Sequence, residues 1–105
     1  MKANEIVYTK TNVRLCALCG KVATETHHLI YGTSPRKLAD EDGITMPLCR
    51  ECHKDVHYLG KLGNLSKMFG QLMWEYWWIA DFGDADSVVA HAKKEFRERY
   101  GRSWL

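Results

Sequence analysis

The chain has 105 residues, and its 15 basic against 13 acidic side chains give a formal net charge of +2. This length fits one domain, in a size range where a bound metal adds appreciably to a modest core. The sequence contains no run of about 18 apolar residues and no apolar N-terminal signal, which excludes a membrane-spanning protein and predicts a cytoplasmic one. The small net charge alone does not indicate a polyanionic partner.

The first sixty residues predict short strands and short helices. Residues 1–12 are polar apart from a brief apolar run, and they fit either a strand or a loose arm. After them, the residue patterns and turn signals predict strands over 24–30 and 44–46 and helices over 34–43 and 50–59.

Capping signals set the expected ends of these helices. Ser34 followed by Pro35 fits an N-cap with proline in the first turn, and Gly43 fits the end of the same helix. Gly60 and Gly63 are expected to end the next helix.

The pattern becomes helical after Gly63. Asn64 fits an N-cap, a turn is expected at 82–84, and Gly101 fits the end of a second helix. Apolar residues recur at intervals of three and four in both helices. They are Leu65, Met68, Phe69, Leu72, Met73, Tyr76, Trp77 and Ala80 in the first helix and Ala85, Val88, Val89, Ala92, Phe96 and Tyr100 in the second.

Residues 64–101 are therefore expected to form a helical hairpin that packs on a core of residues 13–59, within a single domain of residues 1–105. Trp74 and Trp78 lie about a third of a turn away from the first apolar stripe. Two interpretations stay open: the tryptophans pack on the core unit, or they form a surface for a second copy or another protein partner.

Four cysteines stand as two Cys-x-x-Cys pairs, Cys16 with Cys19 and Cys49 with Cys52. Thiols stay reduced in the cytoplasm, so this spacing indicates a metal site and not disulfides. Zinc prefers four tetrahedral ligands, and the two pairs would fill all four positions. We therefore predict a structural Zn²⁺. The alternative, four buried free thiols, leaves the repeated spacing unexplained.

Four of the five histidines lie between residues 27 and 57. His53 and His57 are four apart on a predicted helix and share a face, whereas His27 and His28 are neighbours on a strand and point to opposite faces. Three imidazoles on a divalent ion, with a free imidazole nearby to move a proton, suit phosphodiester hydrolysis. The alternative is that His53 or His57 completes the zinc site and the histidine pair lies on the surface.

These motifs together resemble HNH nucleases of the ββα-metal superfamily, in the branch that carries a four-cysteine zinc. The resemblance covers roughly Leu15 to Tyr58. It rests on Cys16-x-x-Cys19, Glu25-Thr-His27-His28 and Leu48-Cys49-x-x-Cys52-His53-x-x-x-His57. Residues 28–43 and 96–101 are also similar to small phage HNH proteins.

The resemblance implies an α+β fold in which a zinc-stapled ββα-metal unit is followed by the helical hairpin. It implies that His27 and His53 bind a catalytic divalent metal, that His28 is the general base, and that His57 completes the metal site or contacts the phosphate. The sequence departs from the family at Ile44, where an asparagine that tethers the loop normally stands. Asp40 and Asp42 are candidates to replace it, and the sequence favours neither.

The basic pair Arg36 and Lys37 lies in the segment that connects the two expected strands and could contact DNA phosphates, although a solvated basic pair is an equal alternative. The basic residues near the C-terminus are offset by glutamates and fit a solvated helix face.

The first hypothesis is therefore a metal-dependent HNH endonuclease that nicks or cuts DNA with little sequence specificity, in a bacterial or phage-infected cell. It would need structural Zn²⁺ and a catalytic Mg²⁺, Mn²⁺, Ni²⁺ or Zn²⁺. The alternative is a non-catalytic zinc module that binds nucleic acid or protein, or a phage accessory factor.

Overall fold

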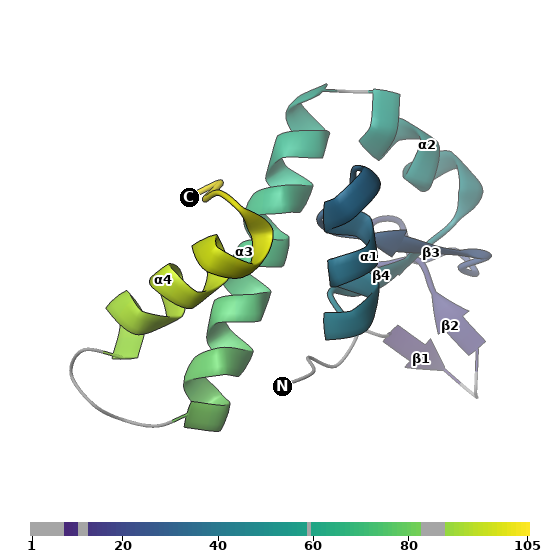
Figure 1. Cartoon of the computed structure of the whole chain (residues 1–105). Helices are drawn as coiled ribbons and strands as arrows, with labels where there is room; N and C mark the ends of the chain where they lie inside the picture. Colours follow the sequence, from purple (N-terminus) through teal and green to yellow (C-terminus); the bar gives the residue numbers. More distant parts are fainter. Residues whose placement is uncertain (1–7, 11–12, 59, 83–87) are drawn as a thin grey trace.

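A computed structural model of the protein describes residues 8–10, 13–58, 60–82 and 88–105. The elements, in chain order, are β1 (Tyr8–Lys10), β2 (Val13–Leu15), β3 (Glu25–His28), α1 (Thr33–Asp42), β4 (Thr45–Leu48), α2 (Arg50–Tyr58), α3 (Gly60–Phe82) and α4 (Val88–Tyr100). The fold is α+β, as predicted (Figure 1). No helix in these described ranges is both long enough and apolar enough to cross a bilayer.

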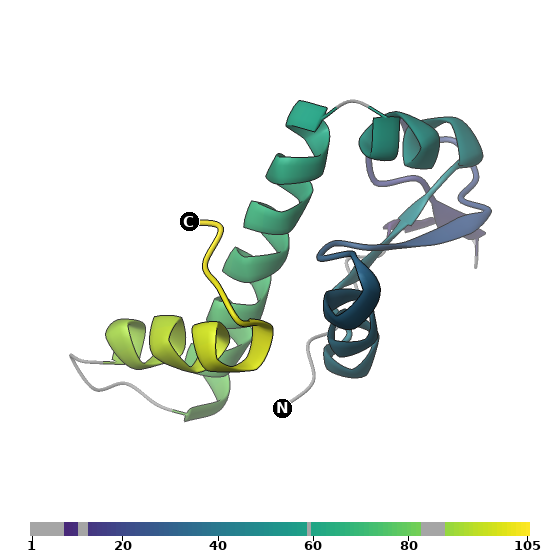
Figure 2. The same ribbon diagram turned by 45° about the horizontal axis from the view of Figure 1, so that its top comes forward.

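Two antiparallel pairs of strands form separate small sheets, β1 with β2 and β3 with β4. In the second sheet His27 lies opposite Met46 and His28 lies opposite Thr45. Helix α1 connects these two strands, and α2 follows β4 after one residue. The long α3 then lies beside this unit, and α4 packs against α3 (Figures 1 and 2).

The helix α1 lies where the sequence predicts it, but the residue that caps its N-terminus differs from the predicted one. The N-cap is Gly32, with φ 126°, and no side chain caps the helix, so the prediction of Ser34 as N-cap is wrong. A positive φ is accessible to glycine without a Cβ clash, which lets the chain enter the helix before Ser34. Gly43 ends α1 in the left-handed conformation, with φ 72°, as predicted.

Helix α2 ends at Tyr58, close to the end predicted from Gly60, but Gly63 does not end a helix, because α3 begins at Gly60 and continues through Gly63 and Asn64. The Asn64 N-cap prediction is therefore also wrong. Gly63 is needed for a close approach: a Cβ there would collide with the Tyr31 hydroxyl and lie 3.6 Å from the Val56 carbonyl oxygen. Its small size serves packing and not helix termination.

Gly70, two turns further along α3, allows a second close approach. A Cβ at this position would lie 2.9 Å from the Leu29 Cβ and 2.8 Å from the Ile30 Cγ1. Both distances are shorter than normal van der Waals contact. The two glycines therefore let the α3 backbone lie directly against the unit that contains β3.

This close packing decides which face of α3 is buried, and of the apolar stripe predicted from sequence only Met73 belongs to that face. Leu65 and Leu72 remain more than half exposed, and Tyr76 is 65% exposed. The buried face contains small, polar and aromatic residues instead: Gly63, Ser66, Gly70, Gln71, Met73, Trp74 and Glu75. The helix is apolar around much of its circumference, so periodicity alone could not identify the packed face.

Aromatic side chains join α3 to α4. Phe96 is fully buried and stacks on Tyr100 with 4.5 Å between ring centroids, and Trp74 meets Phe96 edge-on at 5.5 Å. Gly101, with φ 83°, follows the end of α4 as predicted. The predicted turn at 82–84 lies mostly outside the described residues.

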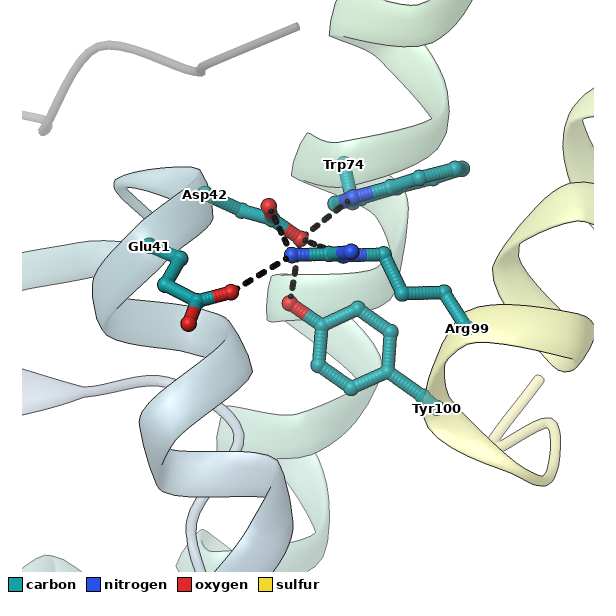
Figure 3. A network of polar contacts seen from close by, with 5 residues as sticks. All are labelled: Glu41, Asp42, Trp74, Arg99 and Tyr100. Atoms are coloured by element: carbon teal, nitrogen blue, oxygen red, sulfur yellow. Dashed lines mark hydrogen bonds and ion pairs between the residues drawn. The ribbon is translucent and has the colours of Figure 1, made fainter.

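A buried carboxylate ties α1 to both C-terminal helices (Figure 3). Asp42 accepts hydrogen bonds from the Trp74 indole at 2.9 Å, from the Arg99 guanidinium at 2.6 and 2.7 Å, and from the Tyr100 hydroxyl at 2.9 Å. We call these four residues the Asp42 clamp. Trp74 thus packs against α1 and α4, as one of the two open interpretations expected. It is only 5% exposed and offers no surface to a partner, whereas Trp78 is half-buried.

Candidate metal centres

The four cysteines are brought together from two turns of the chain. Cys16 and Cys19 lie in the turn after β2, while Cys49 and Cys52 lie at the start of α2. The sulfur atoms all lie within 4.8 Å of one another. Cys19 and Cys49 are 3.7 Å apart at sulfur, far longer than a disulfide bond of about 2 Å. The cluster therefore consists of free thiols and could hold a metal ion.

The surroundings of the cysteines shift the pKa values of their thiols in opposite directions. Burial acts to raise the pKa of Cys16, but hydrogen bonds from neighbouring backbone N–H groups outweigh it and lower this pKa to about 6. Burial, followed by hydrogen bonds with the other three sulfurs, raises the pKa of Cys52. Four sulfurs this close cannot all carry charge without a cation, and a metal ion would supply it.

Three histidines form a second cluster, and one of them, His53, directly follows Cys52 of the first cluster in the sequence. His27 comes from β3, and His53 and His57 come from successive turns of α2. One nitrogen of each ring lies within 4.8 Å of the others. The His53 and His57 Nε2 atoms are 3.1 Å apart. Strand pairing and the i, i+4 spacing thus bring the three imidazoles to one point, and the group could also hold a metal ion.

Glu25 orients the His53 ring. The Glu25 Oε1 atom lies 2.6 Å from His53 Nδ1, so this nitrogen carries the hydrogen and donates it to the carboxylate. The lone pair of His53 is then on Nε2, the atom that faces the other two histidines. A carboxylate behind a histidine in this way is a common arrangement for metal-binding imidazoles.

Ser66 orients the His27 ring from the other side. The Ser66 hydroxyl donates to the Leu29 carbonyl at 2.7 Å and therefore accepts from His27 Nε2, which lies 2.8 Å away. His27 Nδ1 must then carry the lone pair. This atom is buried and has no hydrogen-bond partner among the residues that the structure describes. Buried polar atoms are rarely left without a hydrogen-bond partner. This nitrogen is therefore a candidate to coordinate a metal ion.

Protonation of the histidine cluster is disfavoured. Burial, and then the nearby His53, His57 and His28 rings, lowers the pKa of His27 to about 3. Burial, followed by His53 and Arg36, also lowers the pKa of His57. Both rings are neutral at physiological pH, which is the form that binds metals.

The other predicted site residues have different positions. His28 is not part of the cluster: its Nε2 atom lies 3.0 Å from Asp40 Oδ1 of α1, so the neighbours His27 and His28 have different partners, as alternation along the strand predicts. One open cleft of about 650 Å³ is lined by Arg36, His28 and the three clustered histidines, together with Thr26, Tyr31 and Gly32. Lys37 is exposed on α1 and is not among the described residues that line this cleft.

Sequence reasoning missed the role of Ser66 and gave Glu25 no role beyond the motif. Ser66 lies 39 residues after His27, on a helix whose buried face was misread, and no local signal indicates it. Glu25 could have been found, because residues two apart on a strand share a face and place it beside His27.

Comparisons with known proteins give a family without an assigned function. A family model described as "Protein of unknown function (DUF968)" matches residues 4–73, two thirds of the 105-residue chain. No curated protein and no solved structure matches the chain. The matched residues include both candidate metal centres and the part of α3 that contains Ser66. The chain therefore belongs to the family described as protein of unknown function DUF968.

Proposed function

We propose that this protein is a metal-dependent DNA endonuclease of the HNH type, which hydrolyses phosphodiester bonds with little sequence specificity. The observation that carries the proposal is the unpaired, buried Nδ1 of His27 beside His53 and His57. These three imidazoles open into a cleft that also contains a separate histidine and an arginine. Such a group of residues suits hydrolysis of a charged ester.

The order of elements supports the same proposal. Strands β3 and β4 pair and lead directly into α2, which is the order of a ββα-metal unit. In our proposal the cysteine cluster holds a structural Zn²⁺ that fixes the first turn of α2. His53 follows Cys52 directly, so the zinc would also fix the position of the second metal centre.

Each residue in the cleft has a proposed task. A divalent ion on His27, His53 and His57 would supply positive charge for the phosphate and the leaving oxygen. His28 donates its Nε2 hydrogen to Asp40, so its Nδ1 accepts the proton of the attacking water. The water oxygen bonds to phosphorus as the bond to the sugar oxygen breaks. Arg36 holds a non-bridging phosphate oxygen through its guanidinium.

A plasmid-nicking assay with Mg²⁺, Mn²⁺ or Ni²⁺ tests this proposal. We expect His28→Ala to reduce nicking by about 10²- to 10⁴-fold, since a general base contributes an effect of that size. His91→Ala is the matched control, because His91 is exposed on α4 and does not line the cleft. A wild-type protein that is inert with all three metals, or a His28→Ala variant as active as wild type, would contradict the proposal.

Metal stoichiometry tests the two centres separately. We expect one tightly bound zinc per chain and a second, weaker ion that His53→Ala removes, while the tight zinc remains. Elemental analysis and calorimetric titration measure both quantities.

A second candidate function is a non-catalytic zinc module that binds a partner. The observation in its favour is the exposed apolar face of α3, where Leu65, Leu72 and Tyr76 are each more than half exposed. One bound ion per chain, unaffected by His53→Ala, would favour this module over the nuclease.

A further inference from the structure

A second cavity adjoins the cleft along the outer side of α2. Its volume is about 470 Å³, and its lining residues are Glu25, Arg50, His53, Lys54, His57 and Tyr58. His53 and His57 also line the first cleft. The two hollows therefore meet at His53 and His57, and we call the two together the path.

The residues on the far side of the histidines have a regular spacing. Arg50, Lys54 and Tyr58 are four apart on α2, so they follow one another along one face at about 6 Å per step. Together with Arg36 in the first cleft, they place cations on both sides of the histidine cluster. A path of this kind is complementary to the phosphates of a nucleic acid strand.

These cations are available to a ligand. Arg50 is 86% exposed at its side chain, and its contact with Glu25 is 3.8 Å long. The other Glu25 oxygen is already bound by His53 Nδ1. Lys54 forms no ion pair with any residue that the structure describes. Glu25, the carboxylate among the described residues that line the two hollows, is therefore engaged by His53 through one oxygen and makes only a long contact with Arg50 through the other.

Tyr58 ends this row and is 78% exposed, more than any other large apolar side chain described. Its ring stands beside the cavity without a packing role in the core. Aromatic rings next to a basic path are typical of proteins that bind single strands, because an unpaired base can stack on them. Bases within a duplex are already stacked on their neighbours and offer no free face.

We propose that Tyr58 stacks on an unpaired base and that Arg50 and Lys54 bind the adjoining phosphates, so that the substrate is DNA that is single-stranded next to the cleft. This inference rests on the proposed nuclease function and specifies its substrate. It assigns Tyr58 to substrate selection and leaves hydrolysis to the residues of the first cleft.

Binding of fluorescent oligonucleotides tests the inference without requiring cleavage. The zinc-loaded protein, without added Mg²⁺, Mn²⁺ or Ni²⁺, is titrated into a short single strand containing 2-aminopurine and into the same sequence as a duplex. We expect tighter binding to the single strand and quenching of 2-aminopurine by the stacked ring. Tyr58→Leu should weaken single-strand binding about tenfold, abolish the quenching, and change duplex binding by less than about twofold.

Three further variants serve as controls. Tyr76→Leu removes another exposed tyrosine, on α3 and away from the path, and should bind as wild type does. Tyr58→Trp should retain both affinity and quenching. Lys54→Gln should weaken binding to both forms and reduce the slope of log affinity against log salt by about 0.7 for the single strand.

The outcomes separate this inference from the nuclease proposal. Equal single-strand affinity for Tyr58→Leu and Tyr76→Leu, duplex binding as tight as single-strand binding, or no DNA binding at all would each overturn it. Nicking that depends on His28 but not on Tyr58 would support the nuclease proposal and refute the role of Tyr58 in substrate binding. Tyr58-dependent binding of single strands without nicking would retain the binding site and refute the nuclease.

Discussion

Asp42 and His27 are both buried polar side chains at the centre of a polar group, yet their surroundings differ. Asp42 is 5% exposed and accepts four hydrogen bonds from three side chains of α3 and α4. His27 is 0% exposed, and only one of its nitrogens has a partner in the described structure. A buried polar side chain whose hydrogen bonds are all made within the protein stabilises the fold. A buried polar side chain with an unpaired atom is a candidate to bind a ligand such as a metal ion.

The two regions around these residues are also held together differently. The region with β3, β4 and α2 has short strands and two clusters of side chains that could bind a metal ion. The region with α3 and α4 has stacked aromatic rings and the Asp42 clamp (Figure 3). The first region should therefore depend on bound metal, and the second on its own side chains.

The largest effect should follow the loss of a cysteine ligand. We expect Cys49→Ala to lose the zinc and to lower the free energy of unfolding by about 5 kcal/mol or more, because zinc binding is coupled to folding. Urea denaturation with zinc analysis measures both. Leu18→Ala, in the exposed position between Cys16 and Cys19, should retain zinc and most of the stability. Unchanged stability in Cys49→Ala would show that the cluster needs no metal.

Asp42→Ala should have the next largest effect. It leaves the Arg99 guanidinium and the Trp74 and Tyr100 donors without their acceptor, which should cost about 3–5 kcal/mol of unfolding free energy. Glu41→Ala removes only an exposed contact with Arg99 and should cost less than about 1 kcal/mol. Similar losses in the two variants would mean that the clamp is no more than a surface ion pair.

Ser66→Ala tests the orientation of His27. We expect metal affinity at the histidine cluster to fall about 10- to 100-fold, because the ring loses the group that fixes its tautomer. Titration with Ni²⁺ or Mn²⁺ measures the affinity. Asn64→Ala, exposed on the same helix, is the control and should bind as wild type does. Wild-type affinity in Ser66→Ala would refute an orienting role.

The smallest effect concerns pH and the clamp. Burial, and then the Asp42 carboxylate, raises the pKa of Tyr100. Above pH of about 10 the unfolded chain therefore releases the phenol proton while the folded chain keeps it. Stability should then fall by up to about 1.4 kcal/mol per pH unit from this group. Tyr100→Phe should show a shallower fall over the same range, and an identical slope would exclude the tyrosine as its cause.

Local signals were sufficient for much of the candidate site. Two Cys-x-x-Cys spacings predicted the four-cysteine cluster, and the i, i+4 spacing placed His53 beside His57. Strand alternation separated His27 from His28. These predictions succeed because the relevant distances are set within one turn of helix or one step of strand.

Predictions about α3 failed because they depend on what the helix packs against. The apolar residues at helical spacing, including Leu65 and Leu72, are exposed, while Gly63 and Gly70 face the unit that contains β3. From sequence, Gly63 was expected to end a helix, and no role was predicted for Gly70. Only a contact with Tyr31 or Leu29, far away in the chain, gives them a packing role.

The sequence by itself determined the α+β class, the types and spacing of the candidate metal-binding side chains, and most of the short elements that contain them. The tertiary structure alone decided which face of α3 is buried, that Ser66 supports His27, and that Asp42 joins α1 to α3 and α4. The physical reason is the separation along the chain of the residues that determine each property. Ligand spacing follows from the local geometry of the backbone, whereas burial and hydrogen-bond partners depend on contacts between residues separated by thirty positions or more.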